Sequence, residues 1–271
     1  MLVDHIVVSR ESIRNSDAYA VIKSNISVVN YLLEEGAEPG ELSPDALGSY
    51  YVDYYLAEVT NGGIAQFMFN CCGEHRILDH VTRVLPLLGA TGHAGLFSEV
   101  RARWDAMDAE EKRVFLDGGL FNSPDPFEGL SDRVYELNGS EDLIELNSAF
   151  IRNHPNLEVI RLKRLEAHLA GIIRTIPDLA ARLAERERLA EENKPRYARI
   201  IDVICEEYGM ELVRITAGDP GFIHEDEERV AWHFLTDHGH YSMVDMGERA
   251  VVFDDDGDEI AVVDIARVPT G

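Results

Sequence analysis

Three carboxamide side chains, those of Asn61, Gln66 and Asn70, lie close together in the sequence. Residues four apart on a helix share a face, so the carboxamides of Gln66 and Asn70 can meet there. Because a carboxamide both donates and accepts hydrogen bonds, these groups could line a polar pocket for a small ligand or for catalysis. The same residue types also satisfy backbone groups at caps and corners, and no strongly basic or nucleophilic side chain lies among them. We therefore favour a structural role over a catalytic one.

A second group that could do chemistry is the histidine pair His238 and His240. Residues two apart on a strand share a face, and His224 and His233 are near in sequence, so a zinc or iron site is one interpretation. Gly239, between the two histidines, favours a polar turn between strands instead. We expect no metal site and no cofactor, and we assign no catalytic residue.

The acidic run Asp254–Asp258, with the sequence DDDGD, invites comparison with a calcium-binding loop. An EF-hand needs ligands at alternate positions ahead of its glycine and a glutamate six residues beyond it. Counting back five residues from Gly257 reaches Val252, which cannot supply the first ligand. A hairpin turn between two strands is the better interpretation.

Motifs of common enzymes are absent: the sequence has no GxxxxGK[ST] loop, GxSxG elbow, HExxH pair or dinucleotide fingerprint. Cys71, Cys72 and Cys205 form no CxxC pair and no disulfide framework, which predicts free thiols in a reducing compartment. No run is apolar enough to span a bilayer, and Met1–Ser12 lacks the features of a signal peptide. We expect a cytoplasmic protein that binds a partner rather than an enzyme.

Two helices joined at a glycine corner must position the carboxamides. Pro44 can occupy the first helical position, with Ser43 as its cap. The helix that follows has a stripe of apolar and aromatic residues at helical spacing, which predicts one buried face. This stripe consists of Tyr51, Val52, Tyr55, Leu56 and Val59.

Asn61, Gly62 and Gly63 should end that helix, because Asn and Gly tolerate the left-handed conformation that a helix end often needs. A second helix can begin at Gly63, with Gln66 reaching back to the amide of this cap as in a capping box. The side chains of this second helix that are spaced for burial are Ile64, Phe67 and Met68.

The segment around the corner resembles the signature of a bacterial family long described as a domain of unknown function, whose best-described branch is a small acidic DNA-mimic protein. The motif that carries the resemblance follows a tyrosine-rich helix and reads NGGxxQFxxN. Its residues are Asn61, Gly62, Gly63, Gln66, Phe67 and Asn70. Ser131–Glu158 is similar to the later helices of that family, so the resemblance covers Glu41 to Ile160. The chain is longer than the mimic and carries a different C-terminal module.

Charge divides the chain into three parts. The sequence has 50 acidic and 25 basic residues, a net charge of −25, and such a field repels nucleic acid and anionic membranes while it attracts basic proteins. Residues 1–150 have a net charge of −15, residues 151–195 have +2, and residues 196–271 have −12. We predict an acidic helical domain over residues 1–194, with connector helices over 156–194, and a small α+β domain over residues 195–271.

The remaining patterns give an α+β fold with a mainly helical N-terminal domain. A short strand is predicted within residues 2–9, and helices over 17–35, 75–88 and 96–107, the last after a turn over 89–95. Asp108 and Glu111 can form a capping box for the next helix, and a longer loop follows over Gly118, Gly119 and the Pro124/Pro126 stretch. A long helix is predicted from Asn156. The C-terminal domain has one helix, 197–208, and five short strands of a small antiparallel sheet.

The acidic surface and the family resemblance together suggest an acidic protein-binding protein, a DNA mimic that occupies a basic DNA-binding protein. The carboxylates that could contact this partner are Glu34, Glu35, Glu38, Glu41, Asp45, Asp53, Glu58, Asp105, Asp108, Glu110 and Glu111. The alternatives are a ligand-binding or catalytic pocket at the glycine corner and an immunity-type protein that neutralises a basic toxin. A homodimer is left open, and direct binding of nucleic acid or membrane is not expected.

Overall fold

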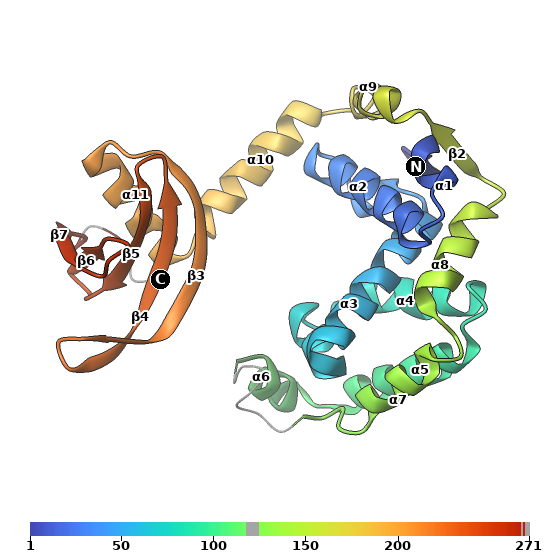
Figure 1. Ribbon diagram of the computed structural model, residues 1–271, viewed down its shortest axis with the longest axis horizontal. Coiled ribbons are helices and arrows are strands. Elements are labelled where there is room, and N and C mark those ends of the chain that lie inside the picture. Colours follow the sequence, from blue (N-terminus) through green and yellow to red (C-terminus); the bar gives the residue numbers. More distant parts are fainter. Residues whose placement is uncertain (118–124, 267, 269–271) are drawn as a thin grey trace. The chain divides into compact units, whose positions relative to one another are not determined.

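The structure is a computed structural model that describes residues 1–117, 125–266 and 268 (Figure 1). Its internal contacts form two compact units, Met1–Leu183 and Ala184–Gly271. The first unit is mainly helical and the second contains an antiparallel sheet, so the predicted α+β class is confirmed. The part of the predicted loop that contains Gly118, Gly119 and Pro124 lies outside the described residues.

Helix α3 is the centre of the first unit. The helices of this unit are α1 (Arg10–Arg14), α2 (Tyr19–Glu34), α3 (Pro44–Asn70), α4 (His75–Leu87), α5 (Thr91–Ala106), α6 (Ala109–Asp117), α7 (Leu130–Asn138), α8 (Leu143–Arg152) and α9 (Leu162–Ile173), with a 3₁₀ turn η1 (Pro39–Glu41). Helices α2, α4, α7 and α8 all contact α3. The buried side chains of this unit form one continuous hydrophobic core. The predicted cap is confirmed, because the Ser43 hydroxyl accepts from the Ala46 amide at 3.4 Å and Pro44 is the first helical residue.

Two short strands that are far apart in the sequence of this unit pair with each other. Strand β1 (Ile6–Ser9) runs parallel to β2 (Leu157–Ile160), with Ile6 opposite Leu157. The prediction of a helix from Asn156 is therefore wrong, and the helix begins later, at Leu162. Leu157 and Ile160 also fit helical spacing, but pairing with the buried β1 satisfies the backbone of this segment, and only the tertiary structure supplies that partner.

Helix α5 begins at Thr91, within the segment predicted to be a turn, because a carboxylate from a distant loop caps its first amides. Glu141 accepts hydrogen bonds from the Gly92 amide at 3.0 Å and the His93 amide at 3.2 Å. Burial raises the pKa of Glu141, but the amides of Gly92 and His93 outweigh it, so the pKa lies below the ordinary value. The cap thus links the α7–α8 loop to the N-terminus of α5, where the helix dipole favours a negative charge.

We expect Glu141→Gln to lower the free energy of unfolding by about 1 kcal/mol at neutral pH, because glutamine keeps an acceptor but loses the charge. A carboxyl whose pKa is lowered by folding stabilises the fold above its unfolded pKa and stops doing so as the pH falls through its folded pKa. Urea unfolding of both proteins between neutral and acidic pH should therefore show the difference shrinking toward zero on acidification. A constant difference would contradict the assignment.

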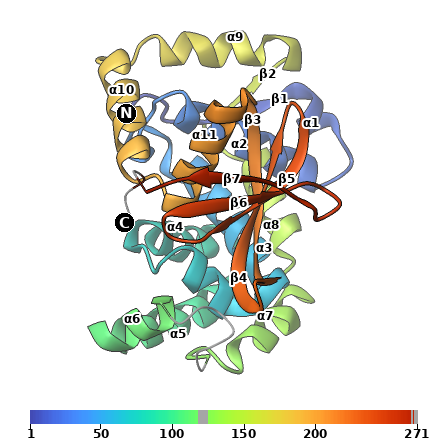
Figure 2. The same cartoon turned by 90° about the vertical axis from the view of Figure 1, so that its left-hand side faces the viewer.

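The second unit packs one helix on an antiparallel sheet. Helix α11 (Arg196–Tyr208) covers one face of a sheet with the strand order β3-β4-β5-β6-β7. The strands are β3 (Leu212–His224), β4 (Glu227–Thr236), β5 (Gly239–Asp245), β6 (Arg249–Phe253) and β7 (Glu259–Asp264). The core between helix and sheet contains Ile200, Ile201 and Ile204 from the helix. All five predicted strands are present, and the β3–β4 hairpin is longer than predicted (Figures 1 and 2).

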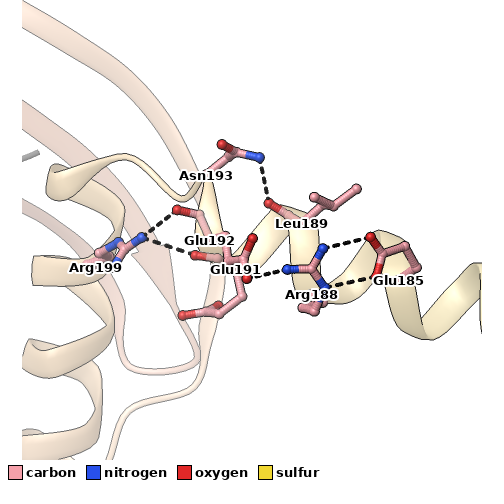
Figure 3. Close-up of polar contacts among 7 residues, drawn as sticks. All are labelled: Glu185, Arg188, Leu189, Glu191, Glu192, Asn193 and Arg199. Carbon is pink, nitrogen blue, oxygen red and sulfur yellow. Dashed lines mark hydrogen bonds and ion pairs between the residues drawn. The ribbon is translucent and has the colours of Figure 1, made fainter.

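Helix α10 (Leu179–Glu192) includes the point where the two units divide, and its end is tied to α11 (Figure 3). Arg199 donates to the backbone carbonyls of Glu191 at 3.2 Å and Glu192 at 2.8 Å, which caps the C-terminus of α10. Arg188 lies between Glu185 and the Glu192 side chain and forms ion pairs with both. The domain boundary predicted at residue 195 follows this junction and stays a prediction.

Candidate functional site

Helix α3 bends at the glycine corner, as the sequence predicts. Gly62 (φ −149°, ψ 22°) and Gly63 (φ 81°, ψ −178°) depart from helical geometry, so α3 consists of two helices joined at this point. The dihedral angles of Gly63 lie in a region that is open almost only to glycine. A side chain at position 63 would also place its Cβ 2.7 Å from the Ser131 hydroxyl. Position 63 therefore requires glycine for two reasons.

Helix α7 caps both sides of the corner. The Ile64 amide, at the start of the second half of α3, donates to the Ser131 hydroxyl at 3.0 Å. The Tyr135 hydroxyl donates to the Val59 carbonyl at 3.0 Å, at the end of the first half. The predicted capping box from Gln66 to Gly63 is wrong, because the Gln66 side chain bonds to Asn61 and Glu58 instead. The hydroxyl that caps this start of a helix comes from Ser131 of the distant helix α7.

The carboxamides of the corner converge on the Glu58 carboxylate. Gln66 donates to Glu58 Oε2 at 2.7 Å and Asn70 donates to the same oxygen at 2.6 Å. Asn61 in turn donates to Gln66 Oε1 at 3.1 Å. Gln66 and Asn70 therefore meet through a shared acceptor, and the motif forms a side-chain network rather than backbone caps. Such a network fixes the direction of one carboxylate at the bend.

Burial disfavours the charged, nucleophilic form of two other polar groups near the corner, Tyr54 and Cys71. Burial raises the pKa of Tyr54 to about 12, and the nearby Glu58 charge acts in the same direction. Burial also raises the pKa of the Cys71 thiol to about 11, so this thiol stays protonated at neutral pH. Cys72 is exposed and has a positive φ of 49°. These groups fit a packed corner better than a catalytic centre.

Two open hollows lie on the first unit, and neither includes the corner carboxamides in its lining. One of about 390 Å³ lies between α5 and α7 and includes Glu99, Arg133 and Glu136 in its lining. The other, of about 340 Å³, is lined by residues around His5 and Glu158. The corner carboxamides line neither hollow, so neither supports a ligand pocket at the corner.

The carboxylates predicted to contact a partner have different environments. Glu35 and Glu38 are exposed beyond the end of α2, and no cation lies within ion-pair distance of them among the residues that the structure describes. Glu34 is exposed beside them. Glu41, by contrast, forms a bidentate ion pair with the Arg182 guanidinium, with nitrogen–oxygen distances of 2.8 and 3.1 Å. Glu41 is therefore held within the fold.

Asp45 and Asp53 also serve the interior of the first unit. Asp45 pairs with Arg83 at 2.7 Å and with His154 at 2.9 Å. Burial raises the pKa of Asp53, while a hydrogen bond from the Tyr19 hydroxyl at 3.4 Å opposes that rise. Neither carboxylate is presented to solvent as a free charge.

The four carboxylates of the α5–α6 region make local contacts, three of them at the start of α6 and Asp105 within α5. Asp108 accepts from the Glu111 amide at 2.9 Å, and Glu111 accepts from the Asp108 amide at 2.8 Å, so the predicted capping box is confirmed. Glu110 forms an ion pair with Arg113 at 2.6 Å, and Asp105 lies 3.8 Å from Arg101. Most of this acidic group therefore has a local structural role.

Sequence reasoning missed the acidic face of α7. Asp132 and Glu136 are exposed, four residues apart, and neither is within ion-pair distance of a cation in the described part of the chain. They flank Ser131 and Tyr135, the two residues that cap the corner. The fourfold spacing was the available signal, but the sequence alone did not show that α7 lies against the glycine corner.

The two histidines of the second unit, His238 and His240, lie next to different carboxylates. His240 hydrogen bonds to Asp255 at 2.8 Å and stacks on His233 with ring centroids 5.4 Å apart, whereas His238 lies 3.6 Å from Asp237. In the described ranges, no group of three His, Cys, Asp or Glu side chains could hold a metal ion.

The acidic run forms the predicted turn between β6 and β7. Asp254 accepts from the amides of Asp256 and Asp258, and Gly257 has a φ of 83°. The hairpin interpretation is therefore confirmed for this segment.

No helix within the described residues has both the length and the apolar character that crossing a membrane requires.

Comparison with known proteins gave one result. The model of a family described as DMP19-like protein matches residues 40–154. This region contains the glycine corner, α7 and α8. No curated protein and no solved structure matched the chain.

Proposed function

We propose, from the match of residues 40–154 to the DMP19-like family, that this helical region is a DNA mimic that occupies a basic DNA-binding protein. The family match covers the same part of the chain as the resemblance to acidic DNA mimics. It is the observation that carries the proposal, and the charge and rigidity of the region support it.

The matched region has a charge that suits this role. It contains 19 acidic and 8 basic residues, a net charge of −11. Duplex DNA carries about one negative charge per 1.7 Å of its axis, and proteins that bind it present Lys and Arg at matching positions. Carboxylates at fixed positions on helices can present a similar field, and a rigid surface loses less entropy on binding.

The face around α7 and the glycine corner is the best candidate for the contact. Asp132 and Glu136 lie one helical turn apart, a separation of about 5–6 Å between Cβ atoms. Glu58 is held at the corner by two carboxamides. These carboxylates are not neutralised by an ion pair, unlike Glu41 and Asp45, so their charge is available to a partner.

The test is affinity capture from a lysate of the source organism, followed by elution with salt and with duplex DNA and by mass spectrometry. The wild type should retain a basic DNA-binding protein that both eluents release. Asp132→Lys/Glu136→Lys should weaken its affinity about tenfold or more, because four units of charge change at the contact.

Glu206→Lys/Glu207→Lys is the matched control. It makes the same charge change at two exposed residues of α11, in the other unit, and should leave the affinity within about twofold. If all three proteins retained the DNA-binding protein equally well, the proposed contact face would be contradicted. Capture of a basic protein that does not bind DNA would favour toxin neutralisation, and the lack of any salt-sensitive partner would reject mimicry.

A further inference from the structure

A cluster of cations interrupts the acidic surface of the first unit. We call it the basic patch, and its residues are Arg10, Arg14, Arg161, Lys163 and Arg164. The first two are on α1, and the others are at the start of α9. No carboxylate lies within ion-pair distance of these five cations in the described part of the chain. A local positive charge in a chain of net charge −25 needs an explanation.

Glu11 joins the two halves of the basic patch. Its carboxylate accepts from the Leu162 amide at 2.8 Å, so α1 lies against the N-terminus of α9. The Leu162 amide is the main cause of a lowered pKa of Glu11, and the charges of Arg10 and Arg14 add to it. The hydrogen bond therefore brings the cation-bearing helix α1 next to the cation-bearing start of α9.

The position of the cations on α9 does not stabilise that helix. The N-terminus of a helix carries a partial positive charge, so Arg161 and Lys163 are placed where the dipole disfavours them. In α10, by contrast, Arg188 is paired with Glu185 and Glu192 (Figure 3). The fold thus neutralises Arg188 and leaves the cations at the start of α9 for an interaction outside the unit.

The basic patch also contains an exposed apolar side chain. Leu162 is 59% exposed and lies between Arg161 and Lys163. Arginine is enriched at protein-binding surfaces, and an exposed aliphatic side chain beside it can pack against a partner, whereas a site for a phosphate backbone needs only the charges. The fitting partner is an acidic protein segment with an exposed apolar side chain.

The tip of the β3–β4 hairpin has that chemistry. Four acidic residues follow one another there, namely Glu225, Asp226, Glu227 and Glu228. Ile223, just before them, is 69% exposed. Arg249 pairs with Glu225 and Arg229 pairs with Glu227, so the tip keeps a net negative charge.

The tip of this hairpin has acidic residues at turn positions where they are not the favoured residue types. Glu225 and Asp226 form a two-residue turn with φ values of 52° and 63°. A turn with positive φ at both positions favours Asn-Gly, and a glutamate is unfavourable there. Acidic residues in place of the favoured pair point to a binding role for the charge.

We propose that the hairpin tip of one copy of this chain binds the basic patch of a second copy. Ile223 would pack against Leu162 while the acidic residues meet the cations around it. Two such contacts, made reciprocally, close a symmetric dimer. This interface is independent of the proposed DNA mimicry, because it uses neither α7 nor the glycine corner.

Sedimentation velocity at about 0.01 M and about 1 M salt tests the proposal, because the Debye length falls from about 30 to about 3 Å between these conditions. The wild type should be a dimer at low salt and a monomer at high salt. Arg161→Glu/Lys163→Glu should raise the dimer dissociation constant about tenfold or more. It also places acidic residues where the helix dipole favours them, so loss of the dimer would not reflect unfolding of α9.

Charge exchange makes the test specific. Glu227→Lys/Glu228→Lys should also be monomeric alone, but an equal mixture with Arg161→Glu/Lys163→Glu should form a heterodimer, because each reversed surface then meets a complementary one. Arg174→Glu/Arg214→Glu is the control. It reverses two exposed cations outside the patch, which also lack an ion pair among the described residues. This variant should dimerise like the wild type.

Glu225→Asn/Asp226→Gly separates turn stability from binding. This variant supplies the favoured turn residues, so it should raise the melting temperature while it weakens the dimer. Three results would overturn the proposal: a monomeric wild type at low salt, a dimer in Arg161→Glu/Lys163→Glu, or no heterodimer in the mixture. Binding of a duplex oligonucleotide by the wild type that this patch variant loses would assign the patch to nucleic acid instead.

Discussion

Gly63→Ala should lower the free energy of unfolding by about 2–4 kcal/mol, the sum of backbone strain and a steric clash. The φ of 81° and ψ of −178° at this position are unfavourable for any residue with a Cβ. The new methyl group would also lie 2.7 Å from the Ser131 hydroxyl, which caps Ile64. If the Ser131 side chain turned away to relieve this clash, the Ile64 amide would lose its cap. Chemical denaturation followed by circular dichroism measures the change.

Gly95→Ala is the matched control. Gly95 lies inside α5, and a Cβ there would meet no atom within 4 Å. Alanine is the better helix former, so this substitution should raise the stability by up to about 1 kcal/mol. Equal stability of the two alanine variants would contradict the backbone strain and the steric clash assigned to position 63.

The neighbouring position 62 should respond differently. Its φ of −149° is ordinary, and a Cβ there would meet the end of the flexible Gln66 side chain at 2.0 Å. Gln66 can turn away at the expense of its hydrogen bonds to Asn61 and Glu58. The two glycines of the motif therefore have different functions: Gly63 provides the bend and Gly62 leaves room for the carboxamide network.

Phe67→Ala should destabilise the protein by about 3–5 kcal/mol, the usual effect of removing a buried aromatic ring. Phe67 is fully buried, and its ring centroid lies 5.2 Å from that of Tyr55 and 6.0 Å from that of Phe97. Tyr54 contacts the same ring at 5.7 Å. The substitution would leave a cavity beside the corner, and thermal and urea unfolding would measure its effect.

Leu87→Ala is the comparison for Phe67→Ala. Leu87 is a large apolar residue of α4 that is mostly exposed, so its truncation should change the stability by no more than about 0.5 kcal/mol. Phe67→Leu should fall between the two, because it restores part of the lost volume. A loss below about 1 kcal/mol for Phe67→Ala would contradict the position of this ring in the core.

Local sequence signals were sufficient where the interacting groups are near in the chain. Ser43 and Pro44 begin α3, Asp108 and Glu111 form a capping box, and the DDDGD run forms a turn, all as predicted. In each case the donor and acceptor lie within a few residues of one another. Chain connectivity then holds them together, so residue type and spacing decide the local geometry.

Signals that depend on distant partners were misleading. Gln66 was expected to reach the Gly63 amide, but its side chain bonds to Asn61 and Glu58, and Ser131 of α7 caps the Ile64 amide. Leu157–Ile160 was expected to be helical, but it pairs with β1 from the other end of the unit. The start of α5 was expected to be a turn, but the carboxylate of Glu141 caps it.

The sequence by itself determined the net charge of the protein, its α+β class, the glycine corner and the apolar face of each main helix. Only the tertiary structure decided which carboxylates keep their charge. Asp45 and Glu41 are neutralised by Arg83 and Arg182, while Asp132 remains exposed. The reason is physical: an ion pair forms over about 4 Å in space, and a sequence does not specify which residues approach to that distance across the chain.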